Sequence, residues 1–379
     1  MGLSQCTPSK PAPPPPGCGT HVVISVATVI VHSRKPFHRA YLVSHLSMTT
    51  FTQADVVVIG AGLSGLLAAR ELNASGYRVV VLEKGSEVGG RLATRRRDEA
   101  VFDHGAQYFT VLDPAFDSLV HDWQERGIVR VWATGFTLPD GSLKHDGQER
   151  FCGVSGMSVI ARHLAGKLDV RLNAPVAHVA AESHEWKVTV ENAECFVGRS
   201  LLLTPPVPQS LQLLATENPT LPKAIREELE QIEYVPCLAL LVSLSGASLV
   251  PDPGGLWFPG EPIRWIADNH RKGISQGSNG ALTIHAGTDY SRQNWDTPAR
   301  RVIEELLAEA TPWLGTTPVQ THLYRWRYSQ PILPYPQRCL TMKTPAPLVF
   351  AGDAFGGPRV EGAALSGLAA ASALKELIS

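Results

Sequence analysis

The stretch "DVVVIGAGLSGLLAARELNASGYRVVVLEKGSEVGGR" (Asp55 to Arg91) decides the fold. It opens with a β-branched run, which is typical of a strand buried on both faces of a parallel sheet. A glycine turn, helical sequence over 66–72 and a second apolar run over 78–83 follow. This order predicts a βαβ unit of a doubly wound α/β sheet. The turn holds three glycines in the spacing GxGxxG: Gly60, Gly62 and Gly65.

The glycine spacing and the acid that ends the second strand predict a Rossmann-type dinucleotide site. The glycines permit a tight turn, close approach of the backbone to a pyrophosphate, and close packing of helix on strand. The helix N-terminus supplies free N–H groups for the phosphates. Glu83 can accept from ribose hydroxyls and disfavours a 2′-phosphate, so NADP is not expected here. The alternative is a βαβ unit that binds nothing. The turn residues assigned to the cofactor are Gly60, Ala61, Gly62, Leu63, Ser64 and Gly65.

The loop after Glu83 adds a second glycine pair in "GSEVGGRLATRR" (Gly85 to Arg96). Its glycines bring backbone close to a cofactor, and Arg91 offers a bidentate fork for a pyrophosphate. Residues 95–97 instead fit a solvated basic loop. The cofactor residues expected in this part of the chain are Glu83, Lys84, Gly90, Arg91 and Leu92.

A third element near the C-terminus indicates which dinucleotide binds. The sequence predicts a strand over 348–351 and a helix of small residues from Gly362 onward. Asp353, between them, can accept from a ribityl hydroxyl, and the helix N-terminus can face a pyrimidine carbonyl. NAD has no ribityl chain, so this element favours FAD, held non-covalently. The residues assigned here are Gly352, Asp353, Gly362, Ala363 and Ala364.

Composition excludes several classes of function. The chain has 379 residues, 44% of them hydrophobic, and a formal net charge of -1, which gives no electrostatic case for nucleic acid. No apolar run reaches the roughly 20 residues of a membrane-spanning helix. Six widely spaced cysteines without a CxxC pair indicate a reducing compartment. No histidine or cysteine shows ligand spacing, so no metal is expected.

Residues 1–53 contain no Asp or Glu and are set apart from the fold. Two interpretations stay open: an organelle-type targeting extension over residues 1–47, or an over-long start with translation beginning at Met48. The second is favoured and would make the protein cytoplasmic.

Several segments from 55 to the C-terminus resemble the flavin amine oxidase superfamily and, within it, the renalase-like branch. The resemblance implies a Rossmann-type FAD-binding domain with an inserted α+β substrate domain. The FAD-binding domain would comprise residues 54–104, 151–214 and 340–379, and the substrate domain residues 105–150 and 215–339. The segments that carry the resemblance are "FDHGAQYFT" (102–110), "GVSGMSVIARHL" (153–164), "IRWIADNHRKG" (263–273), "LTIHAG" (282–287) and "YRWRYSQ" (324–330).

The resemblance implies an oxidase that takes a hydride from an isomeric dihydronicotinamide dinucleotide onto flavin and reoxidises with O2 to H2O2. Its partners would be this small molecule and O2. Oxidation of a small amine is the second possibility, although no lysine lies between Lys272 and Lys343 to hold a water near the flavin. Cys339 is a weak candidate for a covalent flavin link. A non-catalytic FAD-binding module is the third.

The candidate catalytic residues each have a structural alternative. Gln107 and Tyr108 would face the flavin edge, or cap a turn and fill the core. His285 and Trp326 would contact the substrate, or pack within a sheet. Arg264 would meet a substrate phosphate, or lie exposed. The resemblance further assigns four residues to cofactor binding: Gly105, Ala106, Gln107 and the backbone of Val176.

Overall fold

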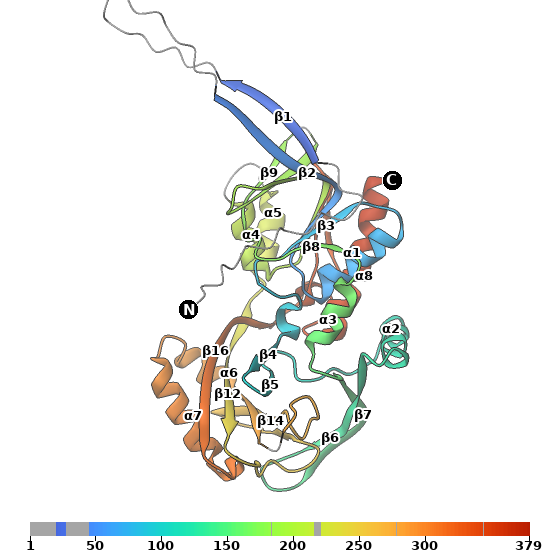
Figure 1. Ribbon diagram of the computed structural model, residues 1–379. Coiled ribbons are helices and arrows are strands. Elements are labelled where there is room, and N and C mark those ends of the chain that lie inside the picture. The colour runs from blue at the N-terminus through green and yellow to red at the C-terminus, as the bar shows by residue number, and fades with distance from the viewer. Residues whose placement is uncertain (1–19, 28–44, 183, 216–220, 278, 344) are drawn as a thin grey trace, which may run out of the picture.

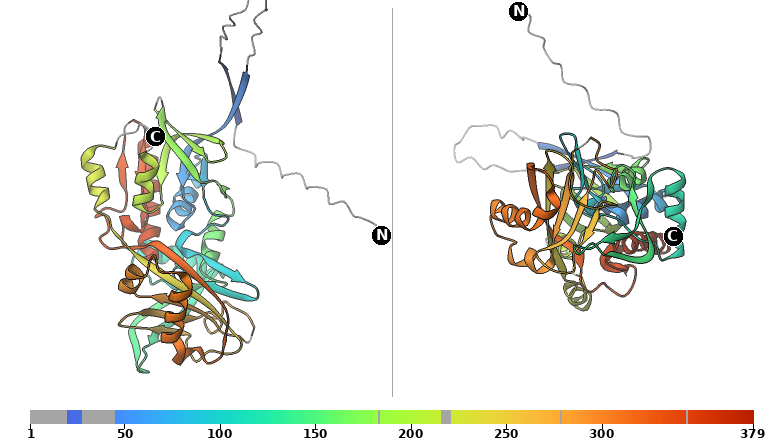
Figure 2. Two further views of the ribbon diagram at one scale, coloured as in Figure 1. Left: turned by 90° about the vertical axis from the view of Figure 1, so that its left-hand side faces the viewer. Right: turned by 90° about the horizontal axis from the view of Figure 1, so that it is seen from below.

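The structure, a computed structural model, describes residues 20–27, 45–182, 184–215, 221–277, 279–343 and 345–379. These residues form two lobes, each built on one sheet, with a small hairpin between them (Figure 1). The left view in Figure 2 shows the same two lobes from another side. A Rossmann-type domain and an inserted α+β domain were expected, and this architecture confirms the fold class. The exact domain bounds stay a prediction.

The first lobe is built on a nine-stranded sheet whose central strands are parallel, in the order β18-β11-β2-β3-β8. Its central strands are apolar because both faces are covered. The strands are β1 (Thr20–Ala27), β2 (His45–Ile59), β3 (Val79–Leu82), β8 (Asp169–Arg171), β9 (Val176–Glu182), β10 (Glu185–Val190), β11 (Cys195–Leu203), β17 (Leu340–Met342) and β18 (Leu348–Phe350).

Strand β2 begins earlier than the sequence predicts. We expected it to start at Asp55, and this bound is wrong, because β2 pairs with β1 over residues 45–52 and with β11 from Phe51 onward. These two partners continue the strand beyond its buried apolar run. The two interpretations of residues 1–47 concern a segment that lies, apart from 20–27 and 45–47, outside the described residues.

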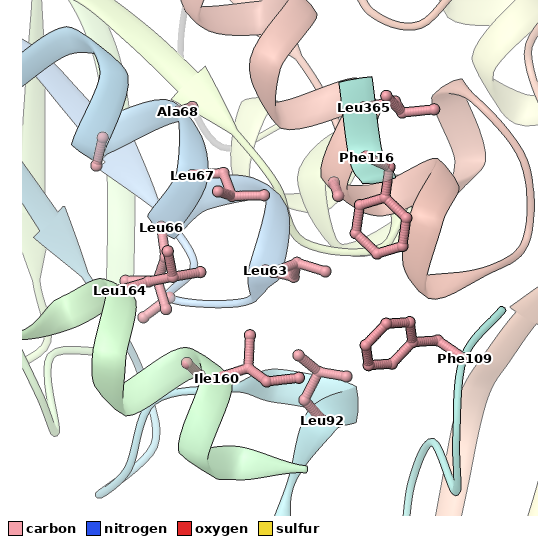
Figure 3. Close-up of a cluster of buried hydrophobic side chains, with 14 of the residues drawn as sticks. Leu63, Leu66, Leu67, Ala68, Leu92, Phe109, Phe116, Ile160, Leu164 and Leu365 are labelled. Atoms are coloured by element: carbon pink, nitrogen blue, oxygen red, sulfur yellow. The ribbon is translucent and has the colours of Figure 1, made fainter. Parts of the chain in front are cut away.

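Helices cover both faces of the first sheet, and α1, α3 and α8 share one core with η1. Leu63 and Leu66 of α1 lie among side chains from α3, α8 and the 109–116 segment (Figure 3). The helices of the chain are α1 (Leu63–Ala74), α2 (Pro114–Glu125), α3 (Ser158–Ala165), α4 (Val207–Leu214), α5 (Lys223–Glu230), α6 (Thr288–Gln293), α7 (Ala299–Leu314) and α8 (Val360–Ile378), with short 3-10 turns η1 (Gly90–Leu92) and η2 (Asp353–Phe355).

The second lobe is a seven-stranded, mostly antiparallel sheet with α7 packed on it. Helix α7 buries one apolar stripe and pairs Arg300 with Glu304 on its exposed side. No helix in the described part of the chain is long and apolar enough to cross a membrane. The strands are β6 (Val129–Thr137), β7 (Leu143–Gly153), β12 (Tyr234–Leu244), β13 (Gly255–Trp257), β14 (Ile263–Asp268), β15 (Ala281–Ala286) and β16 (Pro318–Pro331).

A two-stranded hairpin, β4 (Thr94–Arg97) and β5 (Ala100–Asp103), lies between the lobes (Figure 1). It follows the glycine loop of the first lobe. The Val101 amide donates to Ser275 Oγ at 3.1 Å, and the Asp103 amide donates to Asn269 Oδ1 at 3.3 Å, so the second lobe holds the hairpin. The chain that leaves β5 therefore runs where the two lobes meet.

Candidate functional site

The glycine turn joins β2 to α1 and leaves backbone open to a ligand. Gly60 has a φ of 102°, which favours glycine. A Cβ on Gly65 would clash with the Gly60 carbonyl oxygen, so only glycine lets the helix approach the turn this closely. Around Gly62 nothing lies within 4 Å of such a Cβ, and no side chain caps α1. The N-terminus of α1 thus presents N–H groups to an anion.

Glu83 lies beside this turn. Its Oε2 accepts from the Ala61 amide at 2.9 Å, and its Oε1 accepts from the Gly85 amide at 2.8 Å. The segment leading to Val176 runs alongside, since the Ala174 amide donates to the Glu83 carbonyl at 2.9 Å. The structure thus brings the predicted acid, the turn and the Val176 segment together. Lys84 points elsewhere, with its Nζ 3.5 Å from Gln209 Oε1.

Arg91 and Asp353, which are 262 residues apart, form a bidentate ion pair. The distances are 2.6 Å from Nη1 to Oδ2 and 2.7 Å from Nη2 to Oδ1. Burial alone would lower the pKa of Arg91, but the Asp353 carboxylate outweighs that effect and raises it. The sequence assigned these two residues to different parts of the cofactor, and the fold places them side by side. Leu92, next to Arg91, is buried in the core.

The C-terminal motif docks against the glycine turn through α8. Ser64 Oγ donates to the Ala363 carbonyl at 2.6 Å, and Ala364 is fully buried. The Gly352 amide donates to Ser366 Oγ at 2.8 Å, which ties the end of β18 to the same helix. Gly90 also lies close to the glycine turn, since a Cβ there would lie 3.6 Å from Gly62 Cα. The three predicted cofactor motifs therefore border one site.

The segment after β5 carries the next group of predicted residues. A Cβ on Gly105 would clash with the Arg91 carbonyl oxygen, and the Ala106 amide donates to that oxygen at 2.8 Å. Gln107 Nε2 donates to the Asp103 and Gly105 carbonyls at 2.6 and 3.0 Å. The buried Gln107 Oε1 has no partner among the described residues. This amide oxygen is the one hydrogen-bonding atom of the Gln107 side chain that the described residues leave unused.

His285 and Trp326 meet at one carbonyl oxygen. His285 Nε2 and Trp326 Nε1 donate to the carbonyl of His104, at 3.1 and 2.9 Å. The two side chains come from β15 and β16 of the second lobe. They were predicted as separate contacts to substrate. The structure instead joins them through the residue that precedes Gly105.

His104 belongs to this group of contacts, although the sequence analysis gave it no role. Its side chain is 2% exposed, stacks on Trp326 at 4.9 Å between ring centroids, and tilts against Tyr324 at 4.6 Å. Neither ring nitrogen has a partner among the described residues. Burial, with nearby Arg95, lowers the pKa of His104 to about 3, and burial lowers the pKa of His285 to about 4. Both imidazoles are therefore neutral near pH 7.

A buried ion pair holds the 103–107 segment in place. Lys272 Nζ lies 2.7 Å from Asp103 Oδ2 and donates to the Gln107 carbonyl at 2.5 Å, and both charged side chains are fully buried. The other Asp103 oxygen, Oδ1, accepts from Thr94 Oγ1 at 2.5 Å and from the Met157 amide at 2.8 Å. Every charge here is satisfied, so the pair fixes the 103–107 segment. Lys272 lies in the segment 263–273 that carries the resemblance, but the sequence analysis gave it no role, since its partners lie 165 and 169 residues away.

Tyr108 and Arg264 lie apart from this group. Tyr108 packs in an aromatic cluster with Trp132, Phe136 and Trp265, with centroid distances of 6.4, 5.1 and 5.7 Å, and burial raises its pKa. Arg264 is exposed and lies over the Trp257 ring at 4.9 Å. Both positions match the structural alternatives given above, and their catalytic roles stay predictions.

Comparison with known families agrees with this geometry. The NAD(P)-binding Rossmann-like domain matches residues 58–123. The family described as flavin containing amine oxidoreductase matches residues 130–375. The chain belongs to the flavin containing amine oxidoreductase family. The protein is thus an FAD-dependent oxidoreductase, as predicted.

Individual relatives differ in how much of the chain they match. Renalase of Mus musculus is 25% identical over 342 residues, 85% of this chain and 99% of that protein. Putrescine oxidase of Kocuria rosea is 30% identical over 182 residues, 42% of this chain and 38% of that protein. The structure of cyclohexylamine oxidase from Brevibacterium oxydans has a TM-score of 0.66 at 14% identity, covering 85% of this chain and 99% of that chain. This last likeness shows the fold alone.

The residues present fit FAD. The open backbone at Gly62 suits a pyrophosphate, and Glu83 lies at the ribose end. Asp353 keeps carboxylate lone pairs beyond its pair with Arg91 and suits the ribityl chain. Cys339 is a free, partly buried thiol whose pKa is raised by burial. Among the described residues no cluster of three or more His, Cys, Asp or Glu side chains could hold a metal ion.

Proposed function

We propose that this oxidoreductase takes a hydride from a reduced nicotinamide dinucleotide of a non-standard isomer, such as a 2- or 6-dihydro form. The renalase-like resemblance implies this substrate, and the match along nearly the whole of mouse renalase supports it. The observation that carries the proposal is the lack of a free base in the described 103–107 segment and its contacts. When bound, FAD would supply the hydride acceptor, and its reoxidation by O2 with one proton from solvent would give H2O2.

The ionisable groups beside Gly105 are all occupied or neutral. The Lys272 ammonium is held by the Asp103 carboxylate and the Gln107 carbonyl. His104 and His285 have pKa values lowered to about 3 and about 4, so neither is charged near pH 7. A dihydropyridine loses hydride to become an aromatic cation and gives up no proton, so it needs positioning rather than a base. A small amine must first be deprotonated, which this set of residues does not favour.

The side chains of this chain would act by orienting the substrate. The Gln107 amide is held by two carbonyls, so its free Oε1 points in a fixed direction and can accept from a carboxamide N–H. Trp326 is fixed by its bond to the His104 carbonyl, and its indole gives a rigid apolar wall. Side chains that are already held in place lower the entropic cost of bringing the substrate into a geometry that allows hydride transfer.

Anaerobic titration of the FAD-loaded protein tests the proposal. The flavin absorbance band would be followed with a borohydride-derived mixture of NADH isomers, pure 4-dihydro NADH, and a panel of primary amines. We expect rapid bleaching by the isomer mixture alone and peroxide when air returns. Bleaching by amines instead would identify an amine oxidase. A flavin that no compound bleaches would favour a non-catalytic FAD-binding module.

A further inference from the structure

A basic cavity of about 240 Å³ lies beside the hairpin between the lobes. It contains four arginines and a single carboxylate, so its charged side chains sum to about +3 (four positive, one negative). Residues 95–97 were interpreted as a solvated basic loop; Arg96 and Arg97 are exposed, but all three residues belong to β4 and line this cavity. The lining residues are Glu87, Thr94, Arg95, Arg96, Arg97, Ser155 and Arg162.

These positive charges lack matching anions. Glu87 lies 3.9 Å from Arg95 Nη1, the limit of an ion pair, and the buried Arg95 Nε has no acceptor among the described residues. Arg97 donates to the neutral Tyr324 hydroxyl at 2.7 Å, and Arg162 donates to the neutral Ser158 hydroxyl at 2.6 Å. Arg96 makes no ion pair within the described residues. Clustered guanidinium groups repel one another, and a polyanion relieves that repulsion.

Phosphate is the anion that this arrangement suits. A guanidinium presents a planar fork that matches phosphate oxygens bidentately, and several forks around one cavity can hold a diphosphate. Ser155 adds a hydroxyl group to the wall, whereas the Thr94 hydroxyl already donates to Asp103 and accepts from the Ser158 amide. The cavity also differs in position from the pyrophosphate site at Gly60–Gly65, because none of its lining residues belongs to the glycine turn.

Side-chain contacts link the lining of the cavity to the proposed substrate site. Arg97 contacts Tyr324, whose ring lies 4.6 Å from that of His104, which in turn stacks on Trp326. A molecule with one end at Trp326 would therefore carry its phosphates past Tyr324 to reach Arg97.

We propose that this cavity binds the phosphate groups of the dinucleotide substrate, with Arg96 and Arg162 as its main anion contacts. The inference rests on the proposed function, since it assigns the phosphates of that substrate. It explains why a chain with a net charge of only -1 gathers four arginines around one cavity.

Calorimetric titration with ADP-ribose tests the cavity directly. The protein would be saturated with FAD so that the glycine-turn site is filled. The chains compared would be the unaltered protein, Arg96→Gln combined with Arg162→Gln, and Arg300→Gln, an exposed arginine on α7, as the matched control. We expect the Kd for ADP-ribose to rise at least tenfold in the double variant and to stay unchanged in the control. Equal Kd values in all three proteins, or no binding to the unaltered protein, would overturn the proposal.

Flavin reduction separates this inference from the proposed function. The same variants would be reduced by dihydronicotinamide isomers, either as the dinucleotide or as phosphate-free N-methyl compounds. We expect the double variant to need an at least tenfold higher dinucleotide concentration to reach half of its maximal rate of flavin reduction. The concentration of the phosphate-free compound needed for this should not change. Equal sensitivity to both would contradict a phosphate site. If no isomer reduces the flavin while ADP-ribose binds as expected, the proposed function fails and the anion site stands.

Discussion

The two ends of the FAD site are built in different ways. At the glycine turn the partners are close in sequence, as with Ala61 and Glu83, which are 22 residues apart. At the 103–107 segment they are distant: Asp103 and Lys272 are 169 residues apart, and His104 and Trp326 are 222 apart. One end is therefore set by a continuous stretch of chain. The other exists only once the second lobe has folded against the first.

The largest effect is expected at the glycine turn. Gly65→Ala puts a Cβ against the Gly60 carbonyl oxygen, so α1 must move away from the turn that would hold the pyrophosphate. We expect the purified variant to lose its flavin almost completely, as measured by the ratio of flavin to protein absorbance. Gly166→Ala is the matched control, because the nearest atom to a Cβ there is 3.5 Å away. A yellow Gly65→Ala protein would show that this turn is not the cofactor site.

The second effect concerns the long-range end of the site, which is the 103–107 segment with its partners distant in sequence. Lys272→Met leaves the fully buried Asp103 carboxylate without its counter-charge, which typically costs about 3–5 kcal/mol. Urea unfolding should give that loss in the free energy of unfolding. Arg300→Met, in an exposed pair on α7, should leave it unchanged. A small loss in Lys272→Met would mean that the buried pair does not hold the 103–107 segment.

The same contrast explains what the sequence could predict. The βαβ unit, the GxGxxG turn, Glu83 and the C-terminal FAD motif follow from local periodicity and spacing, and the structure has each of them. The early start of β2 was missed because β1 and β11 extend it. His104 and Lys272 lie in segments that carry the resemblance, but they received no role because a lone histidine and a lone lysine carry no spacing signal. Their roles arise from partners more than 100 residues away.

The third effect is a dependence of stability on pH at the long-range end. His104 and His285 have pKa values of about 3 and about 4 in the fold, whereas an unfolded histidine titrates near 6.5. Only the unfolded chain therefore takes up these protons as the pH falls below 6.5. The stabilisation is fully present above pH 6.5 and falls toward pH 4, by about 1.4 kcal/mol per pH unit for each histidine.

Replacement of one histidine isolates this effect from that of carboxylates. In His285→Gln, urea unfolding between pH 7 and pH 5 should show a free energy of unfolding that depends less steeply on pH than in the unaltered protein. The difference should correspond to about one proton. His121→Gln, at an exposed position on α2, should leave the slope as it is. Equal slopes in all three proteins would mean that His285 takes up its proton over the same pH range in the folded and the unfolded chain.

The smallest single effect is expected at the His104 carbonyl, which accepts from both His285 and Trp326. Trp326→Phe removes one donor and leaves the other, so the hydrogen-bond loss should be about 1 kcal/mol. His285→Phe combined with Trp326→Phe leaves the carbonyl with no side-chain donor. The double variant should then lose more free energy of unfolding than the two single variants together. Strict additivity in this double-mutant cycle would show that the two side chains act independently, and that the 222-residue link does not organise this end of the site.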